Sequence, residues 1–337
     1  TRDFADILRD PAIDTVAEVM GGLHPAYEYV TAALRAGKHV VTANKALIAA
    51  YYDELIALAR ENGAALRCTA AVGGGIPWLT SLERAARLDT IEQVGGIMNG
   101  TTNFIMDAMH RAPVDFGDIL RQAQALGYAE ADPSADIDGD DIRRKLCISA
   151  NIAFGALLRE ADIPAFGIRT VTAGDIRAFQ GHGFVCKLLA DARRTEGGIA
   201  ASVMPTLVEA HDPEAAVGTN FNRIGYTGQA IGCQSFYGQG AGKLPTASNV
   251  VQDCLDILEG RRRFYTEEMA HIPVDNTAEA RPCYIRTAAP DAWLRERTAE
   301  TWENGAVITG AVTTGEVLTW AREQLKKDPG CFVAAIR

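Results

Sequence analysis

Short apolar runs alternate with amphipathic segments over the first 72 residues, and this alternation restricts the fold more than any other feature of the chain. The runs 13–20, 39–43 and 65–72 are typical of strands. The segments 25–36 and 52–62 carry apolar residues at helical spacing, and a glycine follows each of them. Strands separated by helices of about 10–15 residues form parallel sheets with crossover connections. The sequence therefore predicts a doubly wound parallel α/β sheet.

Sheets of this kind bind ligands outside the carboxyl ends of their strands. Gly21 and Gly22 follow the first predicted strand, and Asn44 and Lys45 follow the second. A Rossmann-type domain normally begins with a strand, the sequence GxGxxG and a helix, and no GxGxxG occurs in the 337 residues. We therefore interpret residues 1–72 as a partial Rossmann-type sheet whose first βαβ unit is absent.

Beyond residue 72 the pattern changes from alternation to consecutive strands. Strand-like runs follow one another without intervening helices at 184–192, 199–208, 217–226 and 230–237. Consecutive strands indicate an antiparallel or mixed sheet, so we expect a second, α+β domain. The glycine-rich turn 238–242 leads into a predicted helix at 245–259, and a polar linker at 261–280 follows. The tail, 281–337, is predicted as strand, helix, strand, helix and strand.

Composition limits the partners that this chain is expected to bind. The formal net charge of −10 argues against DNA, RNA or an anionic membrane, because these partners require a basic face. Hydrophobic residues make up 47% of the chain, which is enough for more than one core. None of the seven cysteines forms a CxxC pair, so we expect reduced, buried thiols in a cytoplasmic protein. We find no signal peptide and no membrane-spanning apolar run in the sequence.

The stretch 126–148 is the most informative about chemistry, because six acidic residues precede Lys145 within it. Asp141 and Lys145 are spaced to share one face of a helix, beside apolar residues of a packed core. These groups suit an active site, and a solvated acidic loop with an exposed ion pair is the alternative. A divalent metal is another option for clustered carboxylates. The EF-hand spacing fails, however, because Ile137 stands where glycine is required.

Three other features are candidates for a site. Lys45 follows a buried strand at the carboxyl edge of the sheet, and its alternative role is simply to begin the next helix. The glycine-rich turns 73–75 and 238–242 permit close backbone approach to a ligand, or are merely tight turns. The motif at 98–103, MNGTTN, either presents N–H groups to an anion at a helix start or is an ordinary helix cap.

Six separate blocks of the sequence, in this order, resemble the homoserine dehydrogenase family. They lie at 13–22, 36–49, 70–77, 96–105, 123–146 and 238–253. The likeness covers about residues 5–260 of the chain. It implies a dinucleotide-binding domain, residues 1–72 rejoined by 238–260, and a catalytic and dimerising α+β domain, residues 73–237. It further implies a small C-terminal α+β module resembling an ACT regulatory domain, residues 281–337, from which one of four strands is missing.

The resemblance also implies an activity, namely the NAD(P)H-dependent reduction of L-aspartate 4-semialdehyde to L-homoserine in threonine, methionine and isoleucine biosynthesis. The implied cofactor is NADP or NAD, and the implied assembly is a homodimer or homotetramer. Two other interpretations stay open. One is a truncated, non-catalytic dimerisation or regulatory chain. The other is an oxidoreductase of related build that acts on another amino-acid aldehyde.

By this likeness, individual residues acquire expected roles. The residues expected to be catalytic are Lys145 and Lys45. The acids expected to contact the substrate are Glu130, Asp136 and Asp141. The residues expected beside the cofactor are Lys45, Gly21 and Gly240.

A monovalent cation, usually sodium, is held by main-chain carbonyl groups in the family. The positions that match are Thr69, Val72, Gly74 and Ile76. Thr69 stands where the family commonly has glutamate, and we expect little loss because the contact is through the carbonyl group. The chemistry agrees with the expected lysines, since an ammonium group can stabilise the alkoxide that forms when hydride reaches an aldehyde carbon.

Overall fold

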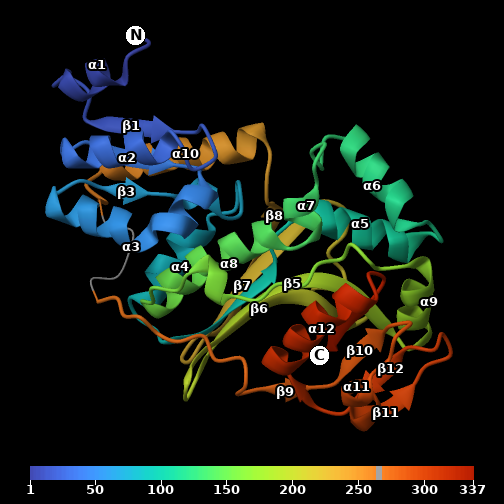
Figure 1. Cartoon of the computed structure of the whole chain (residues 1–337). Coiled ribbons are helices and arrows are strands. Elements are labelled where there is room, and N and C mark those ends of the chain that lie inside the picture. Colours follow the sequence, from blue (N-terminus) through green and yellow to red (C-terminus); the bar gives the residue numbers. More distant parts are fainter. Residues whose placement is uncertain (263–267) are drawn as a thin grey trace. The chain divides into compact units, whose positions relative to one another are not determined.

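The computed structural model describes residues 1–262 and 268–337 (Figure 1). The expected linker at 261–280 therefore lies partly outside the described residues. The chain divides into two compact units, which are described separately below. The first unit comprises residues 1–92, 144–160 and 226–272, and the second comprises 93–143, 161–225 and 273–337.

A three-stranded parallel sheet forms the centre of the first unit. Its strands, in spatial order, are β1 (Thr15–Glu18), β2 (His39–Thr42) and β3 (Leu66–Arg67). The helices that connect them are α2 (Ala26–Arg35) and α3 (Lys45–Glu61). The predicted Rossmann-type alternation is thus confirmed. The third strand is shorter than predicted, because a 3₁₀ turn, η1 (Thr69–Ala71), follows it.

Both faces of the central strand β2 are buried. Val40 and Val41 are each 0% exposed, and successive residues of a strand point to opposite faces. Val41 packs with Ile257 of helix α10 (Lys243–Leu258), and α2 also packs on β2. Burial on both sides explains why this strand is continuously apolar in sequence. Helix α10 therefore packs on the parallel sheet, although most of the chain separates the two in sequence.

A nine-stranded mixed sheet carries most of the remaining strands, in the order β11-β12-β10-β14-β6-β5-β4-β7-β8. Five of these are β4 (Ile91–Ile97), β5 (Phe184–Thr195), β6 (Gly198–Glu209), β7 (Phe221–Gly228) and β8 (Gly232–Gln239). Strands β5 and β6 pair antiparallel along their whole length, from Phe184 opposite Glu209 to Thr195 opposite Gly198. The predicted mixed sheet is confirmed.

Helices precede and interrupt these strands in the chain. Three of these helices are α5 (Gly100–Arg111), α6 (Phe116–Ala125) and α8 (Asp140–Phe154). The remaining ones outside the tail are α1 (Phe4–Arg9), α4 (Trp78–Ala86), α7 (Ser134–Ile137) and α9 (Ala173–Gly181), with the 3₁₀ turn η2 (Glu160–Asp162). The boundary between the two units falls inside α8, after Arg143.

The tail contributes four strands to the nine-stranded sheet, so the prediction that one of four strands is missing was wrong. In chain order its elements are β10 (Cys283–Arg286), α11 (Ala292–Arg297), β11 (Thr298–Thr301), β12 (Val307–Thr309), α12 (Thr314–Lys327) and β14 (Phe332–Ile336). This β-α-β-β-α-β order is ferredoxin-like. The strand β11 was hidden because all four of its residues are exposed at the sheet edge, so no apolar alternation reveals it.

The tail shares its sheet with the rest of the second unit, although the sequence suggested a separate module. Strand β14 pairs parallel with β6, and a short strand pair, β9 (Ala280–Arg281) with β13 (Val312–Thr313), lies outside that sheet. The fully buried Asp175 of α9 accepts hydrogen bonds from Tyr284 Oη at 2.5 Å and Arg286 Nε at 2.7 Å. This buried charged group ties β10 to α9 within one compact unit.

Candidate functional site

Glu18 organises the loop that follows β1. It is the last residue of the strand and is 4% exposed. Its Oε1 accepts hydrogen bonds from the backbone N–H of Met20 at 2.7 Å and of Gly21 at 3.3 Å. Its Oε2 accepts a hydrogen bond from Thr42 Oγ1, at the end of the neighbouring strand, at 2.5 Å. One buried carboxylate therefore shapes the carboxyl edge of the parallel sheet.

Asn44 connects the two features that were predicted at this edge. Its Oδ1 caps α3 by accepting from Leu47 N, and its Nδ2 donates to the carbonyl of Gly22 at 2.6 Å. The structure thus brings the loop containing Gly21 and the start of α3 together. Lys45 is the first residue of that helix and is half-buried, so the alternative considered for it, that of beginning a helix, is confirmed.

The two glycine-rich turns lie against each other. A Cβ on Gly74 would come within 2.6 Å of the carbonyl carbon of Gly240, and Gly75 N donates to Gln239 O at 3.4 Å. Gly74 also has a φ of +56°, which side-chain-bearing residues rarely adopt. Close backbone approach, rather than a tight turn alone, therefore requires glycine at position 74. Gly240 itself is buried in this contact.

Asn249 of α10 meets two of the carbonyl groups expected to bind a cation. Its Nδ2 donates to Gly74 O at 2.5 Å and to Ile76 O at 3.1 Å. Ile76 O also accepts from Trp78 N at 2.7 Å, and Thr69 O accepts from Val72 N at 3.4 Å. The carbonyls of Gly74 and Ile76 therefore converge on one point, which the side-chain amide of Asn249 occupies. Both lone pairs of Ile76 O have protein partners in this arrangement.

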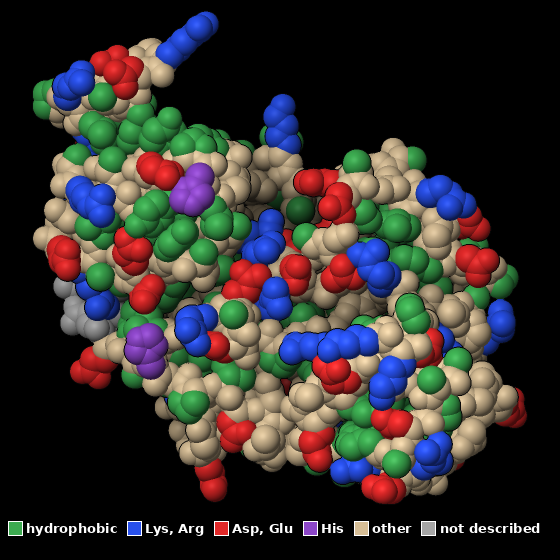
Figure 2. Space-filling model, viewed as in Figure 1, with side chains coloured by type: hydrophobic (Ala, Val, Ile, Leu, Met, Phe, Trp, Pro, Cys, Tyr) green, Lys and Arg blue, Asp and Glu red, His purple; other side chains and the backbone are tan. Residues whose placement is uncertain are grey.

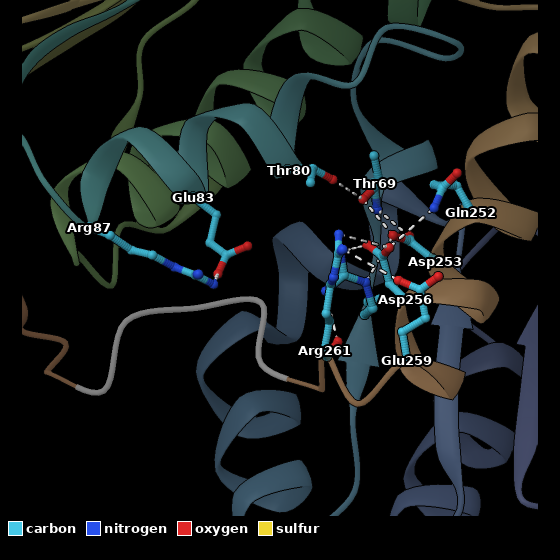
Figure 3. Close-up of polar contacts among 10 residues, drawn as sticks. Thr69, Thr80, Glu83, Arg87, Gln252, Asp253, Asp256, Glu259 and Arg261 are labelled. Carbon is cyan, nitrogen blue, oxygen red and sulfur yellow. Dashed lines mark hydrogen bonds and ion pairs between the residues drawn. The ribbon is translucent and has the colours of Figure 1, made fainter. Parts of the chain in front are cut away.

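A buried ionic cluster fixes the end of β3 to α10 (Figure 3). Arg67 Nε lies 3.0 Å from Asp253 Oδ1, and Arg67 Nη2 lies 2.7 Å from Asp256 Oδ2. Asp253 also accepts from Thr69 N at 2.8 Å and from Thr69 Oγ1 at 2.7 Å. Burial raises the pKa of Asp253 more than these donors lower it. The cluster holds Thr69 in place at the start of the loop with the expected cation carbonyls.

Asp136 and Asp141, two of the three expected substrate acids, share one partner. Asn99 Nδ2 donates to Asp136 Oδ1 at 2.7 Å and to Asp141 Oδ2 at 2.9 Å. Asp136 lies in the short helix α7, and Asp141 in the first turn of α8. Asp141 is 5% exposed, so it lies inside the structure and not in a solvated loop. The third expected acid, Glu130, is exposed, and its carbonyl accepts from Gln124 Nε2 at 3.0 Å.

Lys145 lies one helical turn beyond Asp141 in α8 and is 7% exposed. Its carbonyl accepts a hydrogen bond from Ser149 Oγ, which in turn accepts from the indole of Trp78 at 2.9 Å. The alternative of an exposed ion pair on a solvated loop is therefore wrong for this pair of residues. A lysine held at such low exposure, next to a cluster of carboxylates in the same helix, is typical of a site and not of a solvated surface.

Every polar residue of the motif MNGTTN makes hydrogen bonds within the protein. The sequence had left open whether this motif caps a helix or contacts a ligand. Asn99 caps α5, and Thr101 Oγ1 donates to Tyr128 O at 2.5 Å. A Cβ on Gly100 would lie 2.6 Å from Asn220 O. Asn103 Nδ2 donates to three carbonyls, those of Val217, Thr219 and Phe221. The motif therefore joins the acidic loop to the segment that enters β7.

The described part of the chain bears on the expectations for the cysteines, for a divalent metal site and for membrane-spanning helices. All seven cysteines are free thiols, and five of them are buried. Within residues 1–262 and 268–337, no three His, Cys, Asp or Glu side chains are grouped to hold a metal ion. Nor does any helix in that part of the chain combine the length and apolar character needed to cross a membrane. On the face drawn in Figure 2, acidic and basic side chains are interspersed.

Sequence reasoning missed three polar groups that shape the site. Glu18 and Arg67 each end a strand, and a charged residue closing an apolar run was the available signal. Asn249 lies in a helix whose pattern indicated only an amphipathic segment, so no local signal marked it.

The parallel sheet with crossover helices and polar side chains at its carboxyl edge defines an α/β protein of the Rossmann type, and comparison with known families agrees. The model of the homoserine dehydrogenase NAD-binding domain matches residues 1–69, and the homoserine dehydrogenase model matches residues 77–255. The chain belongs to the homoserine dehydrogenase family.

Individual relatives support this membership. Homoserine dehydrogenase of Bacillus subtilis is 42% identical over 262 residues, which is 78% of this chain and 60% of that protein. The crystal structure of a homoserine dehydrogenase from Thiobacillus denitrificans superposes with a TM-score of 0.89 at 34% identity, covering 100% of this chain and 85% of that one. A hyperthermophilic archaeal homoserine dehydrogenase mutant in complex with NADPH gives a TM-score of 0.65 at 28% identity, covering 77% and 75%. The chain thus spans about 60% of the length of such curated relatives.

Proposed function

We propose that this chain catalyses the NAD(P)H-dependent reduction of L-aspartate 4-semialdehyde to L-homoserine. One observation carries the proposal most directly. Helix α8 places the buried Lys145 one turn beyond the buried Asp141, and Asn99 joins Asp141 to Asp136. The substrate has an ammonium group at one end and an aldehyde at the other. In helix α8 the carboxylate of Asp141 comes before the ammonium group of Lys145, and these two groups suit the ammonium end and the aldehyde end of the substrate, respectively.

The residues divide the work between binding and proton transfer. Asp136 and Asp141 accept hydrogen bonds from the α-ammonium group of the substrate, with Glu130 as a further acid on the exposed loop. Bound NAD(P)H supplies the hydride. When the aldehyde carbon gains that hydride, the carbonyl electron pair moves to oxygen, and the ammonium group of Lys145 stabilises the alkoxide and donates its proton. We assign Lys45 a second catalytic role at the same oxygen.

The carboxyl edge of the parallel sheet fits a dinucleotide. Gly21 and Gly22 adopt φ values of +75° and +72°, and no heavy atom lies within 4 Å of the position that a Cβ would take. This loop therefore leaves room for the close approach of a planar ring to the backbone. We assign Gly21, Lys45 and Gly240 to the cofactor side of the site, and the cofactor is NADP or NAD.

We also assign a sodium ion to the main-chain carbonyls of Thr69, Val72, Gly74 and Ile76. The convergence of Gly74 O and Ile76 O on Asn249 Nδ2 supports this, because oxygens aimed at one point can chelate a cation when the amide turns away. Activity in NaCl should then exceed activity in choline chloride of the same ionic strength. Equal activity in the two salts would remove the cation from the proposal.

The decisive experiment measures NADPH oxidation in the presence of L-aspartate 4-semialdehyde. We compare the chain with Lys145→Ala and with Lys326→Ala, in which an exposed lysine paired with Glu323 is removed. Lys145→Ala should lower kcat by ~100-fold or more while the Kd for NADPH stays unchanged, since general acid catalysis contributes roughly 10²–10⁴-fold. Undiminished turnover in Lys145→Ala would refute the assigned role.

Substrate range and assembly complete the proposal. Reduction of other amino-acid aldehydes with equal kcat/KM would favour an oxidoreductase of related build over the homoserine enzyme. We further propose a homodimer or homotetramer, which the mass of the chain in solution measured by light scattering tests. A mass equal to one chain at micromolar concentration would contradict it.

A further inference from the structure

We propose that Asn99 is a positioning residue for the substrate, because its side-chain amide sets the two carboxylates that receive the ammonium group. The inference rests on the proposed function and adds to it a residue that lies within the block 96–105 but received no role from the likeness. Its ligand class is a small α-amino acid with a free ammonium group. The chemistry is orientation alone, since Asn99 itself contacts the acids and not the reacting carbon.

The hydrogen bonds of Asn99 determine which way its amide faces. On one side, its Oδ1 accepts from Thr102 N at 2.8 Å and from Thr102 Oγ1 at 3.0 Å. A backbone N–H can only donate, so the atom that it meets is the oxygen. The NH₂ group therefore faces the other way, where one hydrogen points to Asp136 at 2.7 Å and the other to Asp141 at 2.9 Å. Each polar atom of the side chain is committed.

The backbone around Asn99 leaves it little freedom. The residue is 4% exposed, and it caps α5 with an extended φ and ψ of −135° and 121°. The next residue, Gly100, lies so close to Asn220 O that a Cβ would come within 2.6 Å of it. Asn103, one turn further on, donates to Val217 O, Thr219 O and Phe221 O. A rigid base of this kind is what a positioning group requires.

The neighbouring acids of the same segment are held in a different way. Asp138 makes a two-bond contact with the guanidinium group of Arg169 at 2.7 and 2.8 Å, and Asp140 pairs with Arg143 at 2.9 Å. A guanidinium group cancels the negative charge that it orients. Asn99 orients Asp136 and Asp141 without adding positive charge. A neutral donor thus fixes the two acids while it preserves the negative potential that attracts an ammonium group.

Two variants of Asn99 separate positioning from simple capping. Asn99→Asp keeps the size of the side chain and the capping oxygen, and aspartate caps helices as well as asparagine does. It replaces the NH₂ group by a third carboxylate oxygen facing Asp136 and Asp141. Asn99→Ser also keeps a capping oxygen and adds no charge, but its shorter side chain lacks the NH₂ group. Asp138→Asn is the matched control, because it neutralises an acid of the same segment that Asn99 does not contact.

The measurements are kcat, the KM for L-homoserine, the KM for NADP⁺ and the melting temperature. Both Asn99 variants should raise the KM for L-homoserine by ~tenfold or more, as expected when hydrogen bonds to charged groups are lost, and leave the KM for NADP⁺ within about twofold. Asp138→Asn should leave both KM values unchanged. In Asn99→Asp, the KM for L-homoserine should recover as the pH falls from 8 to 6, because a proton shared among three carboxyl groups restores one donor.

The outcomes separate this inference from the function on which it rests. If the unaltered chain neither turns over L-homoserine nor binds it in calorimetry, the proposed function falls and takes the role of Asn99 with it. If the unaltered chain is active and both folded Asn99 variants keep their KM for L-homoserine, only the positioning role falls. A loss in melting temperature with KM unchanged would show that the contacts of Asn99 with the two acids stabilise the fold and do not position the substrate.

Discussion

Replacing Arg67 by methionine should destabilise the first unit strongly and in a pH-dependent way. Arg67 is 1% exposed and pairs with Asp253 and Asp256, which are 1% and 2% exposed. The substitution keeps most of the side-chain volume but leaves the buried Asp253 without its cation, and it leaves Asp256 with only the exposed Arg261 at 3.7 Å. Removal of one partner from a buried ion pair costs about 3–5 kcal/mol. We expect a loss in this range at pH 8.

The pH dependence has a definite sign. Burial already raises the pKa of Asp253 with Arg67 present, and loss of the guanidinium group raises it further. The folded variant therefore holds a proton that the unfolded chain releases near pH 4. Its stability rises as the pH falls, by up to ~1.4 kcal/mol per pH unit between the raised folded pKa and the unfolded value. Arg67→Met should consequently be closer to the unaltered chain at pH 5 than at pH 8.

Urea unfolding followed by circular dichroism at pH 5 and pH 8 tests this reasoning. The control is Arg87→Met, which breaks an ion pair with Glu83 that is drawn in Figure 3 and whose arginine side chain is 63% exposed. An exposed pair contributes only about 0–1 kcal/mol, so this variant should differ little from the unaltered chain at either pH. A loss below about 1 kcal/mol at pH 8 for Arg67→Met, or a loss that does not vary with pH, would refute the account.

Three further predictions concern other parts of the structure. Gly74→Ala should lower the free energy of unfolding by about 1–3 kcal/mol and also lower activity, because it combines a positive φ with a clash against Gly240. Gly63→Ala, at a φ of +62° with open space around the new Cβ, should lower it by only about 1 kcal/mol in the same urea assay. Burial lowers the pKa of Lys187 to about 8, so between pH 8 and 10.5 the unfolded chain binds a proton that the folded chain does not. The unaltered chain should therefore gain up to ~1.4 kcal/mol of stability per pH unit relative to Lys187→Met as the pH rises through this range. A stability difference that does not vary with pH would contradict this. Glu18→Ala removes the acceptor that holds the loop after β1, and it should raise the KM for NADPH by ~tenfold. Glu18→Gln retains an acceptor and should raise this KM less. Equal KM values in the unaltered chain and both variants would exclude a role for this carboxylate.

Much of the fold could be predicted because it depends on local spacing. The apolar run at 39–43 and the glycines that close the first two predicted helices placed β2, α2 and the end of α3 correctly. The start of α3 was predicted seven residues too late, because its first turns carry Asn44 as cap and a lysine that was considered for another role. Helix α4 was missed although its buried residues include Trp78 and Leu82. Strand β11 was missed because an exposed edge has no apolar alternation.

The candidate site was predictable only in part. The likeness of the six blocks singled out Asp136, Asp141 and Lys145, and the structure finds the last two buried in one helix. The likeness did not single out Asn99, whose capping role was visible in the sequence while its contacts with two acids 37 and 42 residues away were not. The sequence shows which polar residue stands at a position, but the tertiary structure determines which residue it contacts.

By itself the sequence determined the alternation of strands and helices over the first 72 residues, the glycine positions and the family, because each depends on residues within a few positions of one another or on contiguous motifs. Only the tertiary structure decided that Arg67 meets Asp253 across 186 residues, that Gly74 lies against Gly240, and that β14 extends the sheet beside β6. Burial makes these contacts obligatory, since a charge or a backbone polar group removed from water must find a partner, and that partner can lie anywhere along the chain.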